Sequence, residues 1–429
     1  MASSDLVTRR GWVAALRGMK RITFIDLRGE GETIQVVLPS EMCRDVDREA
    51  FVEVVGELKS VPESARSAHP FELHATGLTV LGKSCGDFST KCPPGCGPDV
   101  KIRERHLYVR DPEFCKITKL RSLLVSATRE HFEQSMTEIF PPSFVGNQCE
   151  GGSTLFKVDY PAKDRGDMPA YLTQSSQFYL EFTLPALGDV FCIAPSFRAE
   201  RSQTRRHVTE FLHVECEWGS VMTMDEHVAK LKHMMKSIVA GFLLRARSLL
   251  MEMDLLERVE RLRDMCDDAI TMTHREAIEY CRAHEIYKDE ETKEHFGDRD
   301  DIPEAAERKM IDRIGKIVYL THFPKEFKSF YFRRGPDDTV LGCDVCVPGV
   351  GEIVGSGVRL SDYEELHAAL LEAGLKPEEY REYLDLRKYG SGCTSGMGLG
   401  LDRMLTWLLD RFSIREVITF PRYPGQLFP

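Results

Sequence analysis

The sequence has no long hydrophobic run, no export signal and no excess of basic charge, and each absence removes a class of protein. No segment approaches the roughly 18 apolar residues that a membrane helix needs, and residues 1–12 lack the apolar stretch of a secretory signal. The formal net charge is -11, which argues against a protein that coats polyanions without specificity. We therefore expect a cytoplasmic protein with no membrane segment.

Cysteine is too sparse for a disulfide scaffold, because the chain has 13 cysteines, an odd number, among 429 residues. A small and odd number of cysteines is expected of a protein whose thiols stay reduced. Cys85, Cys92 and Cys96, with Cys115 nearby, do not follow the spacing of zinc-binding pairs, so we expect loop cysteines there. Hydrophobic residues make up 42% and charged residues 29%, which excludes a disordered or collagen-like chain.

The first hundred residues predict a small β-barrel. Runs of β-branched and aromatic residues between turn residues indicate strands, and they occupy residues 11–13, 21–27, 33–38, 51–58 and 71–81. Five short strands are typical of an OB-fold barrel, which we assign to residues 1–100. The stretch 82–98 is rich in Gly, Pro and Cys and predicts a linker, with a hinge over 101–117.

Residues 118–429 mix helices and strands, so the predicted fold class is α+β. Apolar residues recur at helical spacing within 120–136 and again within 401–412. Between about 225 and 313 the sequence is charged and predicts a mainly helical insertion. This second domain is long enough to bury a large core.

The segment 189–218 predicts two strands joined by a long polar loop. Alternate residues of a strand share a face, so Phe211, His213, Glu215 and Glu217 lie together, opposite the apolar residues between them. Two interpretations fit: an amphipathic hairpin with a solvated outer face, or a cradle in which arginines donate paired hydrogen bonds to a triphosphate. The first strand and the loop carry Arg198, Glu200, Arg201, Arg205, Arg206 and His207.

A glycine-rich turn, residues 396–403 (GMGLGLDR), immediately precedes the C-terminal helix. Glycines allow a backbone to approach a ligand closely, and Arg403 falls in the first helical turn, where a helix favours anions. The segment lacks the Lys-Ser/Thr pair of a phosphate-binding P-loop. Taken alone, it favours a packing turn over a ligand-binding turn.

Two acidic residues flank a hydrophobic strand in residues 344–359 (DVCVPGVGEIVGSGVR). Asp344 and Glu352 are candidate oxygen ligands for Mg²⁺, which prefers one or two carboxylates together with substrate phosphates. Taken alone, this segment favours exposed turn acids over metal ligands.

Together, the three segments resemble the conserved motifs of class II aminoacyl-tRNA synthetases of the aspartyl, asparaginyl and lysyl subgroup, and most closely the asparaginyl-tRNA synthetase family. Residues 118–144 resemble motif 1, which forms the dimer interface in this class. Residues 149–156 (CEGGSTLF) are similar to a substrate loop, and 171–181 (YLTQSSQFYLE) to the amino-acid-binding strand. The resemblance covers nearly the whole chain and implies an antiparallel catalytic sheet flanked by helices.

For ATP, the resemblance implies that Arg198 holds the α-phosphate and stabilises the charge that develops during adenylate formation. Glu200 would accept a hydrogen bond from the adenine amino group, and Phe211 would stack on the ring. The outer phosphates and the nearby backbone would involve Arg206, His207, Gly400 and Arg403.

For the metal and the amino acid, the resemblance implies two further sets. Glu352, with Asp344 and Ser356, would hold Mg²⁺. The amino-acid pocket would contain Glu150, which binds the ammonium, together with Gln174, Gln177 and Arg359.

For the barrel, the resemblance implies an anticodon-binding surface. OB-folds stack bases on aromatic side chains and read their edges with polar ones. Phe24, Gln35 and Glu72 occupy the positions of anticodon-reading residues, although a barrel aromatic such as Phe24 is otherwise a core residue.

The implied activity is ATP-dependent ligation of L-asparagine to tRNA(Asn) through an asparaginyl-adenylate, by a homodimer. We expect the dimer because the apolar stripe within 120–136 has no evident partner in its own chain. An aspartyl enzyme is the first alternative, and an inactive paralogue that binds tRNA or a nucleotide is the second; Arg198 and Arg403 argue against the latter.

The choice between asparagine and aspartate depends on one position. The related aspartyl enzymes carry a lysine where this chain has Leu180. Burying a substrate carboxylate without a cation is costly, whereas an amide needs only hydrogen bonds. Glu181 would repel aspartate further if it reached the pocket, so the sequence predicts a preference for asparagine.

Overall fold

The computed structural model describes residues 6–29, 33–61, 70–149, 154–161, 170–201 and 204–428. The chain forms two compact units, residues 1–110 and 111–428. None of the described helices is long and apolar enough to cross a membrane.

The first unit is a closed five-stranded barrel in the order β1-β2-β3-β5-β4. Its strands are β1 (Leu6–Gly18), β2 (Ile22–Arg28), β3 (Thr33–Pro39), β4 (Phe51–Ser60) and β5 (Phe71–Gly82). Inward residues alternate with outward ones, as in Ile25 and Leu27, which are fully buried in the barrel core. The predicted barrel is confirmed, with a first strand much longer than the expected 11–13.

The predicted linker and hinge contain three short helices, α1 (Phe88–Lys91), α2 (Pro98–Arg103) and α3 (Arg105–Tyr108). The compact unit extends to Arg110, because the Arg110 guanidinium contacts Glu49 at 3.1 Å while Arg28 donates to the Arg110 carbonyl. The cysteines of this region are free thiols, and Cys92 is buried. Among the described residues, no three His, Cys, Asp or Glu side chains are arranged to hold a metal ion.

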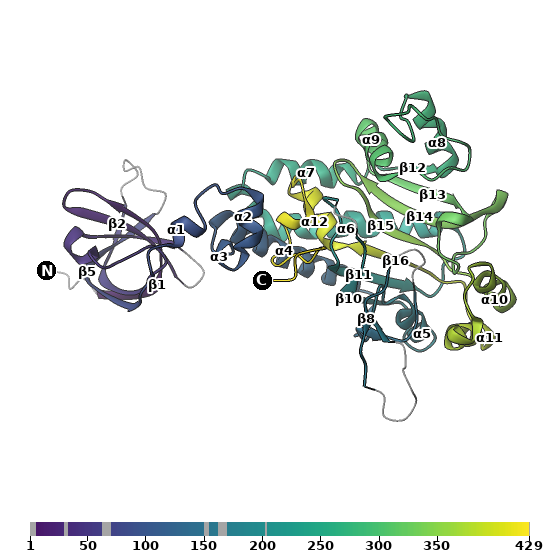
Figure 1. Ribbon diagram of the computed structural model, residues 1–429, viewed down its shortest axis with the longest axis horizontal. Helices are drawn as coiled ribbons and strands as arrows, with labels where there is room; N and C mark the ends of the chain where they lie inside the picture. The colour runs from purple at the N-terminus through teal and green to yellow at the C-terminus, as the bar shows by residue number, and fades with distance from the viewer. Residues whose placement is uncertain are drawn as a thin grey trace. The chain divides into compact units, whose positions relative to one another are not determined.

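The second unit is built on an eight-stranded sheet in the order β12-β13-β14-β15-β16-β11-β10-β6 (Figure 1). The central pairings are antiparallel, whereas β12–β13 and β10–β6 at the two edges are parallel. The expected antiparallel sheet is thus mixed at its edges. Its strands are β6 (Thr137–Glu138), β10 (Val190–Phe197), β11 (Glu210–Trp218), β12 (Ile270–Thr273), β13 (Val318–Pro324), β14 (Thr339–Val347), β15 (Gly351–Val358) and β16 (Ser395–Gly400).

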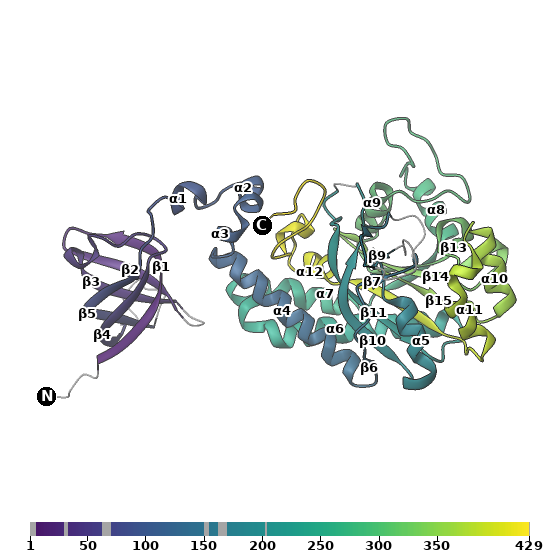
Figure 2. The same cartoon turned by 60° about the horizontal axis from the view of Figure 1, so that its bottom comes forward.

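Two long helices, α4 (Pro112–Glu133) and α6 (Met224–Glu252), lie side by side against this sheet (Figure 2). Asp111 caps α4 by accepting hydrogen bonds from the Glu113 and Phe114 amides. The apolar stripe of α4 is buried in the same core cluster as α6. The expectation that this stripe lacks a partner in its own chain is therefore wrong, because α6 covers it.

The predicted helical insertion around 225–313 is part of the core. It contains α6, α7 (Leu256–Met265), α8 (His274–Ala283) and α9 (Glu304–Ile314), but also the edge strand β12. Helix α12 (Leu401–Leu408) follows β16 directly, as the glycine-rich turn predicts, and α10 (Tyr363–Glu372) and α11 (Arg381–Lys388) precede it.

The segment 171–181, expected as a strand, begins in a strand and ends in a helix. Strand β9 (Ala170–Leu172) belongs to a small sheet with β7 (Phe144–Val145) and β8 (Lys157–Val158), and α5 (Gln177–Leu187) begins five residues later. Helix α5 packs against β10 and β11. Because of this contact, Gln177 reaches the candidate site from a helix and not from a strand.

Candidate active site

Strand β11 presents a row of alternating side chains, Phe211, His213, Glu215 and Glu217, on one face of the sheet. The hairpin of β10 and β11 confirms the predicted pair of strands, and the opposite face of β11 packs into the core. Glu215 and Glu217 are only 3% and 1% exposed. The interpretation of this segment as an amphipathic hairpin with a solvated outer face is therefore wrong, because this polar row is buried.

The glycines of β16 make room for this row. Gly396 pairs with Glu217 and Gly398 pairs with Glu215 across the two strands. A Cβ atom at Gly396 would overlap the Glu217 carboxylate, and one at Gly398 would overlap the His213 ring. The alternating glycines therefore accommodate protein side chains, a reason that the sequence did not reveal.

A cavity of about 260 Å³ lies over this row. Residues from the hairpin, from β14 to β16, from α5 and α12 and from the loop after β13 surround it. Predicted site residues that line it are Gln177, Arg198, Glu200, Arg206, His207, Phe211, Asp344, Glu352, Ser356, Arg359, Gly400 and Arg403. Segments more than 200 residues apart in sequence thus meet in one cavity, as the sequence predicted.

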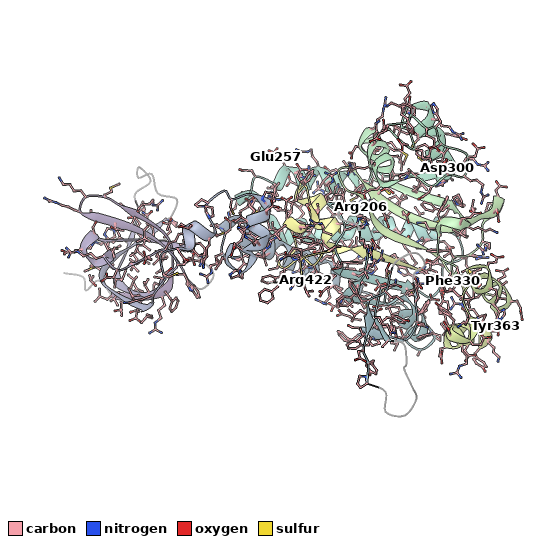
Figure 3. The ribbon with its side chains drawn as sticks, viewed as in Figure 1. Arg206, Glu257, Asp300, Phe330, Tyr363 and Arg422 are labelled. Carbon is pink, nitrogen blue, oxygen red and sulfur yellow. The ribbon has the colours of Figure 1, made fainter. Side chains whose placement is uncertain are left out.

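Two arginines at one end of the cavity are bound to acidic side chains. Arg403, in the first turn of α12, donates to the Glu352 carbonyl at 3.0 Å and to its carboxylate at 3.4 Å. Arg206, labelled in Figure 3, contacts Glu304 at 3.3 Å and Glu307 at 3.2 Å on α9. Burial alone would raise the pKa of Glu352, but Arg403 and the other nearby cations lower it to about 2. This carboxylate is therefore ionised at neutral pH.

Arg198 lies with its guanidinium over the Phe211 ring, 5.4 Å from the ring centre. His207 Nδ1 is 2.6 Å from the Thr204 hydroxyl. Burial, followed by the charge of Arg403, lowers the pKa of His207 below its usual value. Together with Arg206 and Arg403, these groups give this end of the cavity several donors suited to anionic oxygens.

A chain of buried charges closes the other end. Arg359 donates to both carboxylate oxygens of Glu217 and lies 3.9 Å from Glu181. Glu181 also accepts hydrogen bonds from Arg387 at 2.6 Å and from the Tyr383 hydroxyl at 2.8 Å. Burial opposes ionisation of Glu181, but Arg387 and then Arg359 lower its pKa below the ordinary value. Each carboxylate here has a cationic partner, as buried charges require, but burial still raises the pKa of Glu217 to about 8 even though Arg359 opposes the increase.

Several expectations for the amino-acid pocket need correction. Glu181 does not reach the pocket as a repelling charge, because Arg387 neutralises it and Gln177 donates to it at 2.9 Å. Leu180 does not line the cavity; it is fully buried in a small apolar cluster around α5 and β10. Gln174 is buried in the turn before α5, outside the cavity lining, and Glu150 lies outside the described residues.

Glu215 connects the floor of the cavity to the start of α5. It accepts a very short hydrogen bond from the Ser175 hydroxyl and one from the Ser176 amide at 2.8 Å. His213 Nδ1 lies 3.5 Å from Glu215 and 3.1 Å from the Ser196 hydroxyl. Burial raises the pKa of Glu215, and the bonds from the two serines partly offset this increase.

The two predicted metal-binding carboxylates face one gap. A Cβ atom built on Gly355 would lie 3.2 Å from Glu352 Oε1 and 4.0 Å from Asp344 Oδ1. Two carboxylates beside a set of phosphate-binding cations are a donor set that suits Mg²⁺. Asp344 already holds Lys328, whose Nζ donates to both of its oxygens at 2.6 and 2.5 Å.

Ser356 has other hydrogen-bond partners. Its hydroxyl donates to the Cys343 carbonyl at 2.5 Å and lies 2.9 Å from His227 Nε2. The other nitrogen of His227 lies 3.0 Å from the Ser395 hydroxyl, so this histidine joins β15 to β16. When His227 Nε2 donates to it, the Ser356 oxygen keeps a second lone pair that can contact an ion.

In the barrel, the three predicted anticodon residues lie on one outer face. Phe24 points outward and is partly buried, while the adjacent Ile25 is in the core, so Phe24 is not a core residue. Gln35 donates to Glu72 at 2.6 Å across β3 and β5, and Arg17 donates to Gln35 at 3.0 Å. Arg17 pairs directly with Phe24 in the β1–β2 ladder.

The sequence did not identify Glu217 and Lys328, which line the cavity, or Arg387, which binds Glu181 beside it. Glu217 was placed on the polar face of β11 without a role, and the alternation of that strand was the available signal. No local sequence pattern marks Lys328 or Arg387, because the carboxylates that they bind lie 16 and 206 residues away along the chain.

Comparison with known proteins agrees with this geometry. Residues 97–424 match the family described as tRNA synthetases class II (D, K and N), and residues 7–81 match the OB-fold nucleic acid binding domain. The cytoplasmic asparagine--tRNA ligase of Dictyostelium discoideum is 39% identical over 100% of this chain and 65% of its own length. The human cytoplasmic asparagine--tRNA ligase is 38% identical over 98% of this chain and 76% of its own length.

A solved structure is similar along the whole chain. Entamoeba histolytica asparaginyl-tRNA synthetase in complex with asparaginyl-adenylate is 31% identical, has a TM-score of 0.87, and is matched over 100% of this chain and 98% of that one. The buried polar row, the arginines around it and these matches lead to one assignment. The chain belongs to the class II tRNA synthetases of the aspartyl, lysyl and asparaginyl group.

Proposed function

We infer that the chain is an asparagine--tRNA ligase that forms an asparaginyl-adenylate and then transfers asparagine to the 3′ end of tRNA(Asn). The observation that carries this inference is the single cavity over β11. It has cationic donors at one end and a buried Arg359–Glu217 pair at the other. A nucleotide bound at the first end and an amino acid bound at the second end would place their reacting groups next to each other in the middle of the cavity.

The roles proposed for ATP follow the charges of the cavity. Arg198 would hold the α-phosphate and stabilise the charge that develops there, because a preorganised donor favours the transition state. Phe211 would stack on the adenine, and Glu200 would accept from its amino group. Arg206, His207 and Arg403, near the Gly400 backbone, would bind the outer phosphates of ATP.

The roles proposed for the amino acid rest on the opposite end. Arg359 would bind the side-chain carbonyl of asparagine, and Glu217 would accept a hydrogen bond from its amide. A carboxylate at the same place would face Glu217 directly, which is costly in a buried site. Gln177, with Glu150, would complete the pocket around the ammonium and backbone of the substrate.

Mg²⁺ is the metal that the donor set fits. Glu352 and Asp344 would hold it beside the phosphates, with Ser356 as a third candidate, and the ion would neutralise phosphate charge during adenylate formation. The protein groups would position ATP and the amino acid for attack of the substrate carboxylate on the α-phosphate.

We assign tRNA recognition to the barrel. Phe24 would stack on an anticodon base while Gln35 and Glu72 read base edges. The anticodon-binding domain then corresponds to the compact unit ending at Arg110, and the catalytic domain to the unit that follows. The names of the relatives support a cytoplasmic location.

We also propose a homodimer. The stripe of α4 no longer supports this, but a different apolar surface near the same motif does: Phe140 is 88% exposed, and Phe144 and Tyr160 are each 51% exposed. Sedimentation of the intact protein should give twice the mass of one chain, 48.9 kDa. An active monomer would contradict the proposal.

ATP–pyrophosphate exchange tests the function against its alternatives. With each amino acid purified free of the other, exchange should depend on asparagine and exceed that with aspartate by roughly 10⁴-fold, the discrimination that a polar mismatch can give. Equal or faster exchange with aspartate would favour an aspartyl-tRNA synthetase. Absence of exchange with both, together with tRNA binding, would favour an inactive paralogue.

A further inference from the structure

Lys328 lies in the cavity without a role in the activity described above. It follows the short 3₁₀ helix Lys325–Phe327 in the loop between β13 and β14. Its ammonium donates to both oxygens of Asp344 at 2.6 and 2.5 Å and lies 3.9 Å from the centre of the Phe323 ring. The Lys328 and Asp344 side chains are 18% and 10% exposed.

This ammonium occupies a position that a divalent metal would need. Mg²⁺ approaches its carboxylate oxygens to about 2.0–2.1 Å, and both Asp344 oxygens already have a cation beside them. An ammonium and a divalent ion on the same carboxylate repel each other strongly where water is scarce. The metal therefore competes with Lys328 for Asp344.

The rest of the cavity adds to this competition. Arg403 contacts Glu352, the other candidate ligand, at 3.0 and 3.4 Å. Without a nucleotide, a divalent ion would enter a space whose carboxylates already have cationic partners. The phosphates of ATP bring new negative charge, to which Lys328 and Arg403 can turn.

We propose that Lys328 is a resident counter-ion of Asp344 that a divalent metal must displace, so that the Asp344–Glu352 pair binds the metal together with nucleotide phosphates and only weakly without them. This rests on the proposed metal site of an ATP-using enzyme. Lys328 acts through Asp344 and is a positioning residue. Because the metal must displace Lys328 from Asp344, ATP and the metal bind cooperatively.

Mn²⁺ binding to the full-length protein, followed by electron paramagnetic resonance, tests this directly. Without nucleotide, Lys328→Met should bind Mn²⁺ roughly tenfold or more tightly than the wild type, within the usual range of coupling between sites. With the non-cleavable analogue α,β-methylene-ATP, the two proteins should bind Mn²⁺ within about threefold of each other. Nucleotide-free affinity that is unchanged or weaker in Lys328→Met overturns the proposal.

Matched variants separate the possible causes. Lys328→Arg keeps the charge and should retain weak nucleotide-free binding, and Lys325→Met removes a nearby lysine that pairs with Asp338 instead and should behave like the wild type. If Lys328→Met does not fold, Lys328→Gln keeps one donor for Asp344 and should give the same tightening. Asp344→Asn and Glu352→Gln should weaken binding of the Mn²⁺–analogue complex to the protein, because the phosphates of the analogue then hold the ion without the full set of carboxylates. Wild-type binding by both would reject the metal site itself, whatever the result at Lys328.

Discussion

Both units place their candidate functional residues on the strand face that points away from the apolar core, but only the catalytic unit buries that face. In the barrel, Phe24 and Gln35 project outward from strands whose inner residues form an apolar core. In the catalytic unit, Glu215 and Glu217 project into a polar cavity that is itself buried. The barrel can therefore lose a functional residue without loss of its core, whereas the catalytic unit cannot readily lose a charge without leaving its partner unpaired.

The difference predicts how function and stability are coupled. Outer-face residues of the barrel interact mainly with solvent and with one another, through modest surface hydrogen bonds. The cavity charges form a chain from Glu217 through Arg359 and Glu181 to Arg387. Four substitutions test this contrast, from the largest expected effect to the smallest.

Arg387→Met should destabilise the catalytic unit by about 3–5 kcal/mol, because it leaves the Glu181 charge buried without its closest cation. Arg381→Met removes an exposed arginine from the same helix, α11, and should change stability by less than about 1 kcal/mol. Urea unfolding followed by tryptophan fluorescence in a Trp12→Phe background reports on this unit, since it leaves Trp218 and Trp407. A small loss for Arg387→Met would show that Arg359 alone neutralises Glu181.

Arg198→Ala should reduce ATP–pyrophosphate exchange by about 10²–10³-fold, the usual loss when a preorganised donor to a transition state is removed. The melting curve should stay close to that of the wild type, because Arg198 is a partly exposed residue at the end of β10. Arg201→Ala, an exposed arginine in the same loop, is the control. Near-normal exchange by Arg198→Ala would reject the proposed α-phosphate contact.

Phe24→Ala should weaken tRNA charging by about 1–3 kcal/mol, the value of one base stacked on an aromatic ring. Pyrophosphate exchange without tRNA should be unchanged, because the ring lies in the barrel and outside its core. Leu81→Ala removes a more exposed apolar side chain, 51% accessible, from the far end of β5 and should affect neither assay. Equal losses in both assays would place Phe24 in a structural role.

The smallest effect concerns pH. His227 is fully buried, and burial lowers its pKa to about 3, below the value of about 6.5 expected in the unfolded chain. The neutral ring therefore contributes stability that is complete above pH 6.5 and is lost as the pH falls toward 3. At pH 5.5 the loss is about 1.4 kcal/mol relative to neutral pH. The free energy of unfolding of His227→Gln, measured with urea at neutral pH and at pH 5.5, should lack this loss. If the wild type and His227→Gln lose the same free energy between the two pH values, the assignment to His227 is contradicted.

Local patterns predicted much of the fold. Runs of β-branched and aromatic residues identified the barrel strands, alternation gave the shared face of β11, and the glycine-rich turn marked the start of α12. These features depend on backbone preferences within a few residues. The helix α5 was missed because a strand-like run, residues 171–181, becomes helical where it packs against β10 and β11.

Long-range pairing explains the other errors. The partners of Arg387 and of the α4 stripe are determined by tertiary packing, which spacing along the chain does not encode. Resemblance to a family placed Arg198, Arg359 and Glu352 in one cavity without this information. The resemblance did not reveal that Leu180 is buried away from that cavity, or that the Lys328 ammonium binds the Asp344 carboxylate.

The central position of β11 restricts how this site can change in evolution. Because side chains alternate along a strand, inserting or deleting one residue within β11 would turn every side chain on one side of the change to the opposite face, so that part of the polar row would point toward the apolar core. It would also misalign Gly396 and Gly398, which leave space for these side chains on the neighbouring strand. New substrate preferences can therefore arise here by substitution, but length changes must be confined to the loop between β10 and β11.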